Sequence, residues 1–221
     1  MRTKTLILTT VLGVASAATT MAQVYSVNAV GYVNKTLVPG FQLVANPLDA
    51  GAGNNTIAKL FAGVPAGTVV YKYTGTGFDV NDYDPDTYGA QGWATPDMTL
   101  VPGEGAFVLL PPGANFTVTF VGEVAQGNLS NPLPAGFSIR SSQVPQSAAL
   151  DTVLKFPVSN GDFIYQYNTT TKSYDTSDYD TDTYGPQGWP GAAPAPAVGE
   201  AFWVKKLAAT NWTRTFSVNT P

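Results

Sequence analysis

The stretch Asp82-Tyr-Asp-Pro-Asp-Thr-Tyr-Gly-Ala-Gln-Gly-Trp93 decides the fold, because nearly the same residues return as Asp178-Tyr-Asp-Thr-Asp-Thr-Tyr-Gly-Pro-Gln-Gly-Trp189, at an offset of 96. The same offset relates residues 37–41 to 133–137 and residues 115–120 to 211–216. Self-similarity at a fixed period is the signature of a repeated structural unit. The sequence therefore predicts one folded unit made twice.

The two copies slip out of register at one segment only. Residues 69–73 match residues 163–167 at an offset of 94, so a length change of two residues precedes this segment and is reversed after it, as loop variation produces. Each copy has about 100 residues, a common size for an independent domain. We expect a first repeat over residues 23–128 and a second over residues 129–221.

The apolar segments predict strands. They are short, rich in Val, Phe, Tyr and Thr, and alternate with a period of two, as in residues 116–120. No helix between them is long enough to connect parallel strands. We therefore expect an all-β protein of two tandem β-sandwich or small-barrel repeats, each with at most one short helix. Asn55 is expected to cap a helix over residues 56–61, and Asp151 a helix over residues 152–156.

Residues 1–22 have the pattern of a secretory signal peptide. Arg2 and Lys4 precede an apolar run over residues 6–18, which is too short to span a bilayer. Small residues place the cleavage site before Gln23, with cleavage after Ala17 as the alternative. The sequence thus predicts a secreted or cell-surface protein, outside the bacterial cytoplasm, with no membrane span after signal cleavage.

The composition excludes several kinds of chemistry. The chain has no His and no Cys, so an imidazole base, a thiolate nucleophile, a disulfide and an ordinary zinc, copper or haem site are all ruled out. Loss of Arg2 and Lys4 with the signal would move the formal net charge from −4 to −6. Because an acidic surface repels phosphate, we expect no nucleic-acid partner.

Aspartates are concentrated in the repeated segment. Eight of the twelve fall within residues 79–86 and 175–182. In an extended segment, alternate carboxylates would share one face and could bind Ca²⁺, the only cofactor the sequence suggests. The alternatives are a solvated acidic hairpin and a polar network with Tyr and backbone groups. The proposed calcium ligands are Asp82, Asp84, Asp86, Asp178, Asp180 and Asp182.

The aromatic residues that follow the acidic run allow two interpretations. Trp93 and Trp189, with Tyr88 and Tyr184, could form an exposed platform on which a sugar ring stacks. Alternatively, the two Trp side chains fill the cores of the two repeats, because buried Trp is common in β-sandwiches.

No catalytic constellation is evident in the sequence. Glu104 and Glu200 are equivalent, so they belong to different repeats, and each follows a glycine just before an apolar strand. A structural role in bonding turn amides therefore explains them better than the paired carboxylates of a glycosidase. No catalytic residues are assigned, and we expect a protein that is not an enzyme.

The chain ends inside its own repeat. Residues 25–28, Tyr-Ser-Val-Asn, resemble residues 216–219, Phe-Ser-Val-Asn, where a third copy would begin. A strand left without its repeat context is an edge that another chain could complete. In the alternative, each copy ends with such a strand and pairs it within its own sheet.

The string Val24-Tyr-Ser-Val-Asn-Ala-Val-Gly-Tyr-Val-Asn34, with Asn46-Pro-Leu48 and the two Gly-Glu strands, resembles short exported bacterial β proteins without assigned function. That resemblance implies an extracytoplasmic duplicated β protein and carries no catalytic residues. Together the observations predict an exported, non-enzymatic structural or cell-surface protein that self-associates through its terminal strands. The alternative is a carbohydrate-binding or calcium-dependent adhesion module, whose partner is an extracellular polysaccharide.

Overall fold

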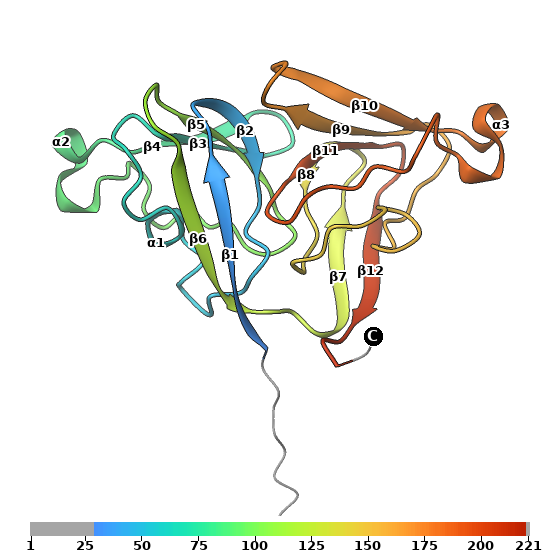
Figure 1. Cartoon of the computed structure of the whole chain (residues 1–221), viewed down its shortest axis with the longest axis horizontal. Coiled ribbons are helices and arrows are strands. Elements are labelled where there is room, and N and C mark those ends of the chain that lie inside the picture. The colour runs from blue at the N-terminus through green and yellow to red at the C-terminus, as the bar shows by residue number, and fades with distance from the viewer. Residues whose placement is uncertain (1–28, 220–221) are drawn as a thin grey trace, which may run out of the picture.

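The computed structural model describes residues 29–219, which form two β-sandwiches, one for each repeat (Figure 1). The strands of the first repeat are β1 (Val30–Leu37), β2 (Gly40–Val44), β3 (Val69–Tyr73), β4 (Phe78–Asp82), β5 (Ala106–Leu110) and β6 (Phe116–Glu123). Those of the second are β7 (Gly127–Leu133), β8 (Gly136–Arg140), β9 (Asp162–Asn168), β10 (Ser173–Tyr179), β11 (Phe202–Lys206) and β12 (Thr210–Phe216). The predicted all-β tandem repeat is confirmed.

Each repeat consists of a two-stranded and a four-stranded antiparallel sheet. In the first repeat β1 pairs with β6, and the larger sheet has the order β2-β5-β3-β4. The second repeat has β7 paired with β12 and the order β8-β11-β9-β10. Strands β3 and β9 occupy equivalent places, so the slipped register changes only the loops before and after them. Because β7 begins at Gly127, the predicted division after residue 128 lies just inside this strand.

Alternation along the strands builds the two cores. In β5, Ala106, Val108 and Leu110 are buried inside the sandwich, whereas Phe107 points to the other face of the sheet. The inward residues of the larger sheet pack against those of the smaller one, such as Phe120 on β6. The second repeat has an equivalent, separate core.

The helices differ from those predicted. Helix α1 covers Ile57–Leu60, and Thr56 at its N-cap position makes no side-chain capping hydrogen bond. The Asn55 side chain instead accepts hydrogen bonds from the Asn46 side chain and the Ala50 amide. Residues 152–154 form a turn, and no helix covers residues 152–156. Two further helices, α2 (Pro85–Tyr88) and α3 (Thr181–Tyr184), lie in the acidic segments and are followed by the 3₁₀ turns η1 (Gly89–Gln91) and η2 (Gly185–Gln187). The first repeat thus has one helix more than expected.

The two repeats pack through the outward faces of their four-stranded sheets, which lie side by side (Figure 1). Matching backbone bonds join them: the amide of Ala45 donates to the carbonyl of Gly199 at 3.0 Å, and its equivalent, the amide of Ser141, donates to Gly103 at 3.1 Å. The two bonds join equivalent residues, with the donor in the first repeat in one bond and in the second repeat in the other. The repeats are therefore related by an approximate twofold axis that passes between the sheets.

The terminal strand of each repeat pairs within that repeat. Strand β12 runs antiparallel to β7, with Phe216 opposite Gly127. This agrees with the alternative in which each copy ends with a strand of its own sheet. The matching segment at residues 25–28 and the proposed signal peptide lie outside the described residues. Between residues 29 and 219, no helix is long and apolar enough to cross a membrane.

Candidate functional site

Aromatic side chains cover the outward faces of the two four-stranded sheets, where the repeats meet. The first repeat contributes five of them, and the second contributes an aromatic residue at every equivalent position. The five pairs are Phe41 and Phe137, Tyr71 and Tyr165, Tyr73 and Tyr167, Phe78 and Tyr174, and Phe107 and Trp203. This duplicated aromatic face is the most distinctive surface of the molecule.

The aromatic face is indented by two hollows of about 380 Å³ each. Such volumes are within the range of small-molecule sites, about 300–1,000 Å³. The first hollow is lined by Phe41, Tyr71, Phe78, Phe107, Tyr167 and Tyr174. The second hollow is lined by Tyr73, Phe137, Tyr165, Tyr174 and Trp203.

Each hollow is completed by the other repeat. The first hollow has four walls from the first repeat and receives Tyr167 and Tyr174 from the second. The second hollow receives Tyr73, the equivalent of Tyr167, from the first repeat. A single repeat therefore supplies most of the residues that line one hollow, and each hollow needs residues from both repeats.

Contacts between rings hold these walls in place. Tyr73 meets Trp203 edge to face with ring centroids 4.7 Å apart, and the equivalent pair, Tyr167 and Phe107, meets at 5.8 Å. Edge-to-face pairs of this kind contribute about 0.5–1.5 kcal/mol beyond simple burial. The approximate twofold axis passes between Phe107 and Trp203, whose centroids are 6.3 Å apart.

The hollows present both apolar rings and polar groups to solvent. Phe41 and Phe137 are 44% and 43% exposed, large fractions for Phe side chains on a sheet. Burial raises the pKa of Tyr165 and of Tyr174, so both phenols remain protonated at neutral pH and can donate a hydrogen bond. The surface can thus contact the apolar face of a ligand and bond to its rim.

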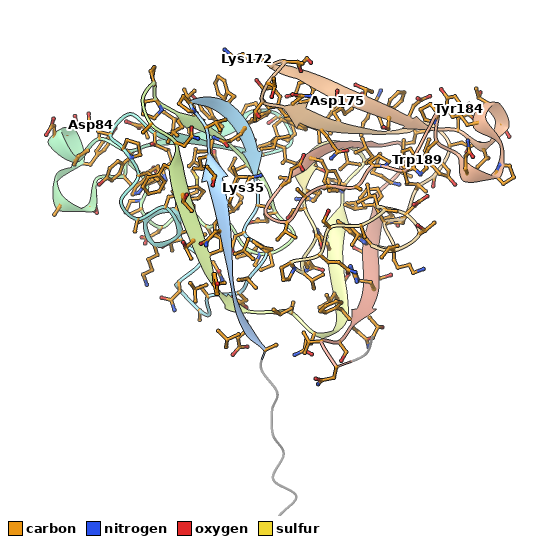
Figure 2. All side chains as sticks on the ribbon, in the orientation of Figure 1. Lys35, Asp84, Lys172, Asp175, Tyr184 and Trp189 are labelled. Atoms are coloured by element: carbon orange, nitrogen blue, oxygen red, sulfur yellow. The ribbon has the colours of Figure 1, made fainter. Side chains whose placement is uncertain are left out.

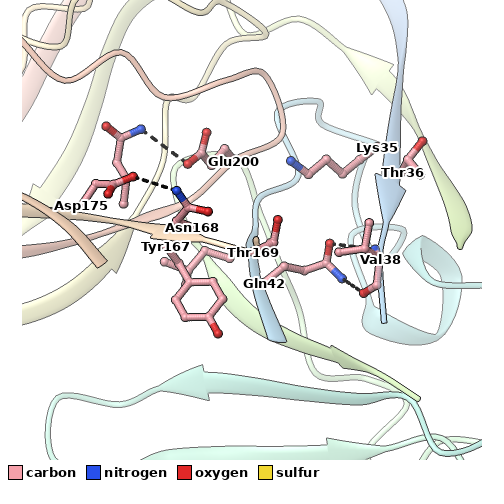
Figure 3. A pocket seen from close by; sticks show the side chains of 11 residues that line it. Lys35, Thr36, Val38, Gln42, Tyr167, Asn168, Thr169, Asp175 and Glu200 are labelled. Carbon is pink, nitrogen blue, oxygen red and sulfur yellow. Dashed lines mark hydrogen bonds between the residues drawn. The ribbon is translucent and has the colours of Figure 1, made fainter. Parts of the chain in front are cut away.

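A polar cleft of about 340 Å³ adjoins the first hollow and shares Tyr167 with it (Figure 3). Lys35 of β1 points across it toward Glu200, which accepts hydrogen bonds from Gln166 and from the amide of Ala197. Its full lining is Lys35, Thr36, Val38, Gln42, Leu43, Gln166, Tyr167, Asn168, Thr169, Asp175 and Glu200.

Trp93 and Trp189 do not form a sugar platform, because they are 1% and 2% exposed and lie in the two cores. The interpretation as core residues is correct.

The repeated glycine before each Trp has a structural reason. Gly92 has φ +69°, and a Cβ there would collide with the ring of Tyr83, which packs on Trp93 with centroids 5.2 Å apart.

The acidic segments are not extended throughout, as the calcium argument assumed. Asp84 is the N-cap of α2: its carboxylate accepts hydrogen bonds from the amides of Asp86 and Thr87 and from the Thr87 hydroxyl. These hydrogen bonds, that of the Thr87 hydroxyl foremost, lower the pKa of Asp84. Desolvation and the negative charge of Asp82 raise the pKa of Tyr88, whose hydroxyl also donates a hydrogen bond to Asp82.

The second repeat reproduces this network. Asp180 caps α3 and binds Thr183, and Asp178 accepts a hydrogen bond from Tyr184 at 3.0 Å. The two acidic segments lie at opposite ends of the molecule, as Asp84 and Tyr184 show in Figure 2. Within the described part of the chain, no three carboxylates form a group that could hold a metal ion. The polar network with Tyr and backbone groups therefore accounts for Asp82, Asp84, Asp178 and Asp180, and calcium binding stays a prediction.

The repeated glutamates play the structural role expected of them. Glu104 accepts a hydrogen bond from the amide of Val101 at 2.9 Å, and Glu200 accepts one from the amide of Ala197 at 2.8 Å. Glu104 also forms an ion pair with Lys72. Gln166 replaces this lysine in the second repeat, so Glu200 forms no ion pair among the described residues of its own repeat.

The aromatic hollows were missed at the sequence level, although a signal was present. Aromatic residues at alternate strand positions, such as Tyr71 with Tyr73 and Tyr165 with Tyr167, recur in both copies opposite buried aliphatic residues.

In comparisons with known proteins, no protein-family model, no curated protein and no solved structure matched this chain, so its candidate site stands on its own geometry.

Proposed function

We propose that this chain is an exported, non-enzymatic binding protein that holds a neutral polysaccharide against its aromatic face. The observation that carries the proposal is the pair of aromatic hollows, each of about 380 Å³ and each lined by rings from both repeats. Export rests on the N-terminal sequence, and the non-enzymatic character on the use of both repeated glutamates in turns.

The chemistry of the face suits a sugar ring. A pyranose has C–H groups on its faces and hydroxyls around its rim, so it needs apolar rings beneath and hydrogen-bonding groups beside it. Phe41 and Phe137 offer exposed rings, with the Lys205 ammonium 5.8 Å from the Phe137 centroid, while Tyr165 and Tyr174 offer neutral phenols. An anionic ligand fits less well, because the whole chain carries more acidic than basic side chains.

Retention on insoluble polysaccharides tests the proposal. The mature protein is incubated with cellulose, chitin, xylan, mannan and β-1,3-glucan, and the bound fraction is measured after washing. We expect retention on at least one of the five and a loss of at least tenfold in the double variant Phe41→Ala with Phe137→Ala. The matched control is Tyr32→Ala, which removes a 72% exposed aromatic ring outside the hollows.

Two results would overturn the proposal. One is the absence of retention on all five polysaccharides. The other is equal retention by the wild type and the double variant when their melting temperatures match. A concentration-dependent dimer that the double variant loses, without any retention, would assign the aromatic face to self-association.

Self-association through terminal strands is a second candidate. Its support is that β1 and β12 each pair with a single strand, so each leaves one edge open to another chain. Thr213→Pro on β12 would block pairing at an open edge. A strictly monomeric wild type at high concentration, by size exclusion and negative-stain imaging, would contradict this candidate.

A further inference from the structure

The two aromatic hollows differ in what lies beside them. The polar cleft opens next to the first hollow, and Tyr167 lines both. The place equivalent to Lys35 in the second repeat is Asn131, which donates hydrogen bonds to the carbonyls of Gly103 at 2.9 Å and Ser141 at 3.3 Å. In the second repeat, an asparagine bonded to the protein therefore stands where the first repeat presents the Lys35 ammonium.

Several polar groups of the cleft have few or no hydrogen-bond partners among the described residues. Within residues 29–219, the Lys35 ammonium has no hydrogen-bond or ion-pair partner, although its side chain is half-buried. Glu200 and Asp175 are held only by the amide side chains of Gln166 and Asn168, at 3.4 Å and 3.3 Å, in addition to one turn amide on Glu200. Donor and acceptor positions therefore remain open on both walls.

The mixture of groups indicates the class of ligand. Lys35 can only donate, the carboxylates of Asp175 and Glu200 can only accept, and Gln166 and Asn168 can do both. A ligand that satisfies all of them must carry several groups that each donate and accept. Sugar hydroxyls do so without bringing a charge into the cleft, whereas a phosphate would meet two carboxylates.

We propose that a single saccharide chain crosses the junction of the repeats, with one unit in the first hollow and the next in the polar cleft, where Lys35, Gln166 and Glu200 bond to its hydroxyls. This inference rests on the proposed function. It adds that the two hollows are unequal, because Asn131, which is bonded to Gly103 and Ser141, takes the place of Lys35 in the second repeat. Tyr167 lines both the first hollow and the cleft.

Binding of soluble sugars tests the inference. Calorimetry with the hexasaccharides and disaccharides of β-1,4-glucose, N-acetylglucosamine, β-1,4-xylose, β-1,4-mannose and β-1,3-glucose gives affinity and stoichiometry for each variant. For the hexasaccharide that binds, we expect one tight site per chain. Lys35→Met should weaken it at least tenfold and should affect the matching disaccharide less than threefold. Lys59→Met, which removes an exposed lysine of α1, is the charge-matched control.

The equivalent residues Phe41 and Phe137 separate the inference from the proposed function. Phe41→Ala in the first hollow should weaken the hexasaccharide at least tenfold more than Phe137→Ala in the second. Equal losses in these two variants, with no effect of Lys35→Met, would overturn the single crossing chain and leave the proposed function intact. If no hexasaccharide binds the wild type, both proposals fail.

Discussion

Gly105 and Ala201 face each other across the approximate twofold axis, and there is room for only one methyl group between them. A Cβ on Gly105 would collide with the Cβ of Ala201, its equivalent in the second repeat, and would lie 2.6 Å from Cγ2 of Ile139. The repeats can approach this closely because the two positions are different. This asymmetry permits the backbone bonds beside it, from Ala45 to Gly199 and from Ser141 to Gly103.

The Gly105–Ala201 contact predicts a reciprocal pair of substitutions. Gly105→Ala should lower the free energy of unfolding by about 1–3 kcal/mol, the usual cost of overpacking. The exchange variant, Gly105→Ala with Ala201→Gly, moves the methyl group across the axis and should recover part of that loss, because the close contact with Cγ2 of Ile139 remains. Urea denaturation measures both. No recovery in the exchange variant would contradict the tight contact as the cause.

The buried ion pair of Lys206 and Asp162 predicts a different pattern. Both side chains are almost fully buried, and Lys206 also donates to the carbonyl of Pro157. Asp162→Asn alone should cost about 3–5 kcal/mol, because it leaves an unpaired buried ammonium.

The first repeat supplies a control for the ion pair, since its equivalent residues are Leu110 and Thr68. The double variant Lys206→Leu with Asp162→Thr should unfold at nearly the same urea concentration as the wild type, because it removes both charges together. A double variant as unstable as Asp162→Asn would refute this interpretation.

Trp203 predicts a fluorescence signal from the aromatic face. Trp93, Trp189 and Trp212 are at most 3% exposed, whereas Trp203 is half-buried on the wall of the second hollow. A collisional quencher such as acrylamide should therefore reach mainly Trp203. Trp203→Phe should remove most of the quenchable emission of the folded protein, and retention of that emission would show that another Trp is accessible.

Asp84 predicts a pH-dependent contribution to stability. Hydrogen bonds from Thr87 and Asp86 place its folded pKa below the ordinary value of 3.8. A carboxylate with a lowered folded pKa stabilises the protein above pH 3.8, and this contribution is lost as the pH falls through the folded pKa. Asp84→Ala should lower the melting temperature at pH 6, and the difference from the wild type should shrink below pH 3.8. Asp97→Ala, at an exposed site outside the helix, is the control.

Calcium binding by the acidic segments gives a simple measurement. After chelator treatment, millimolar Ca²⁺ should raise the melting temperature of the wild type. The rise should be absent from the variant Asp82→Asn with Asp178→Asn, which keeps the helix caps. An unchanged melting temperature of the wild type would end the calcium hypothesis.

The duplication and the all-β class could be predicted because they depend on local patterns. Strand alternation and the 96-residue offset are both visible in the sequence, and the sheets follow them. The turn role of Glu104 and Glu200 could also be predicted, because each follows a glycine at the start of a strand. These features depend on residues close together in the chain.

The site could not be predicted because it depends on which face of a sheet is covered. In β2, Phe41 and Leu43 point outward and Val44 points into the core, so both faces are apolar and the pattern does not distinguish them. The acidic run was misread for a related reason: Asp84 followed by Pro85 is a helix start, and the regular spacing of aspartates concealed it.

The approximate twofold axis has a consequence for what a fused chain can do. Two identical subunits must present every feature on both sides of their axis. Covalent linkage of the repeats removes that requirement, so Lys35 can border an opening on one side while Asn131 seals the other. The two ends of the aromatic face of the duplicated chain can therefore differ from one another.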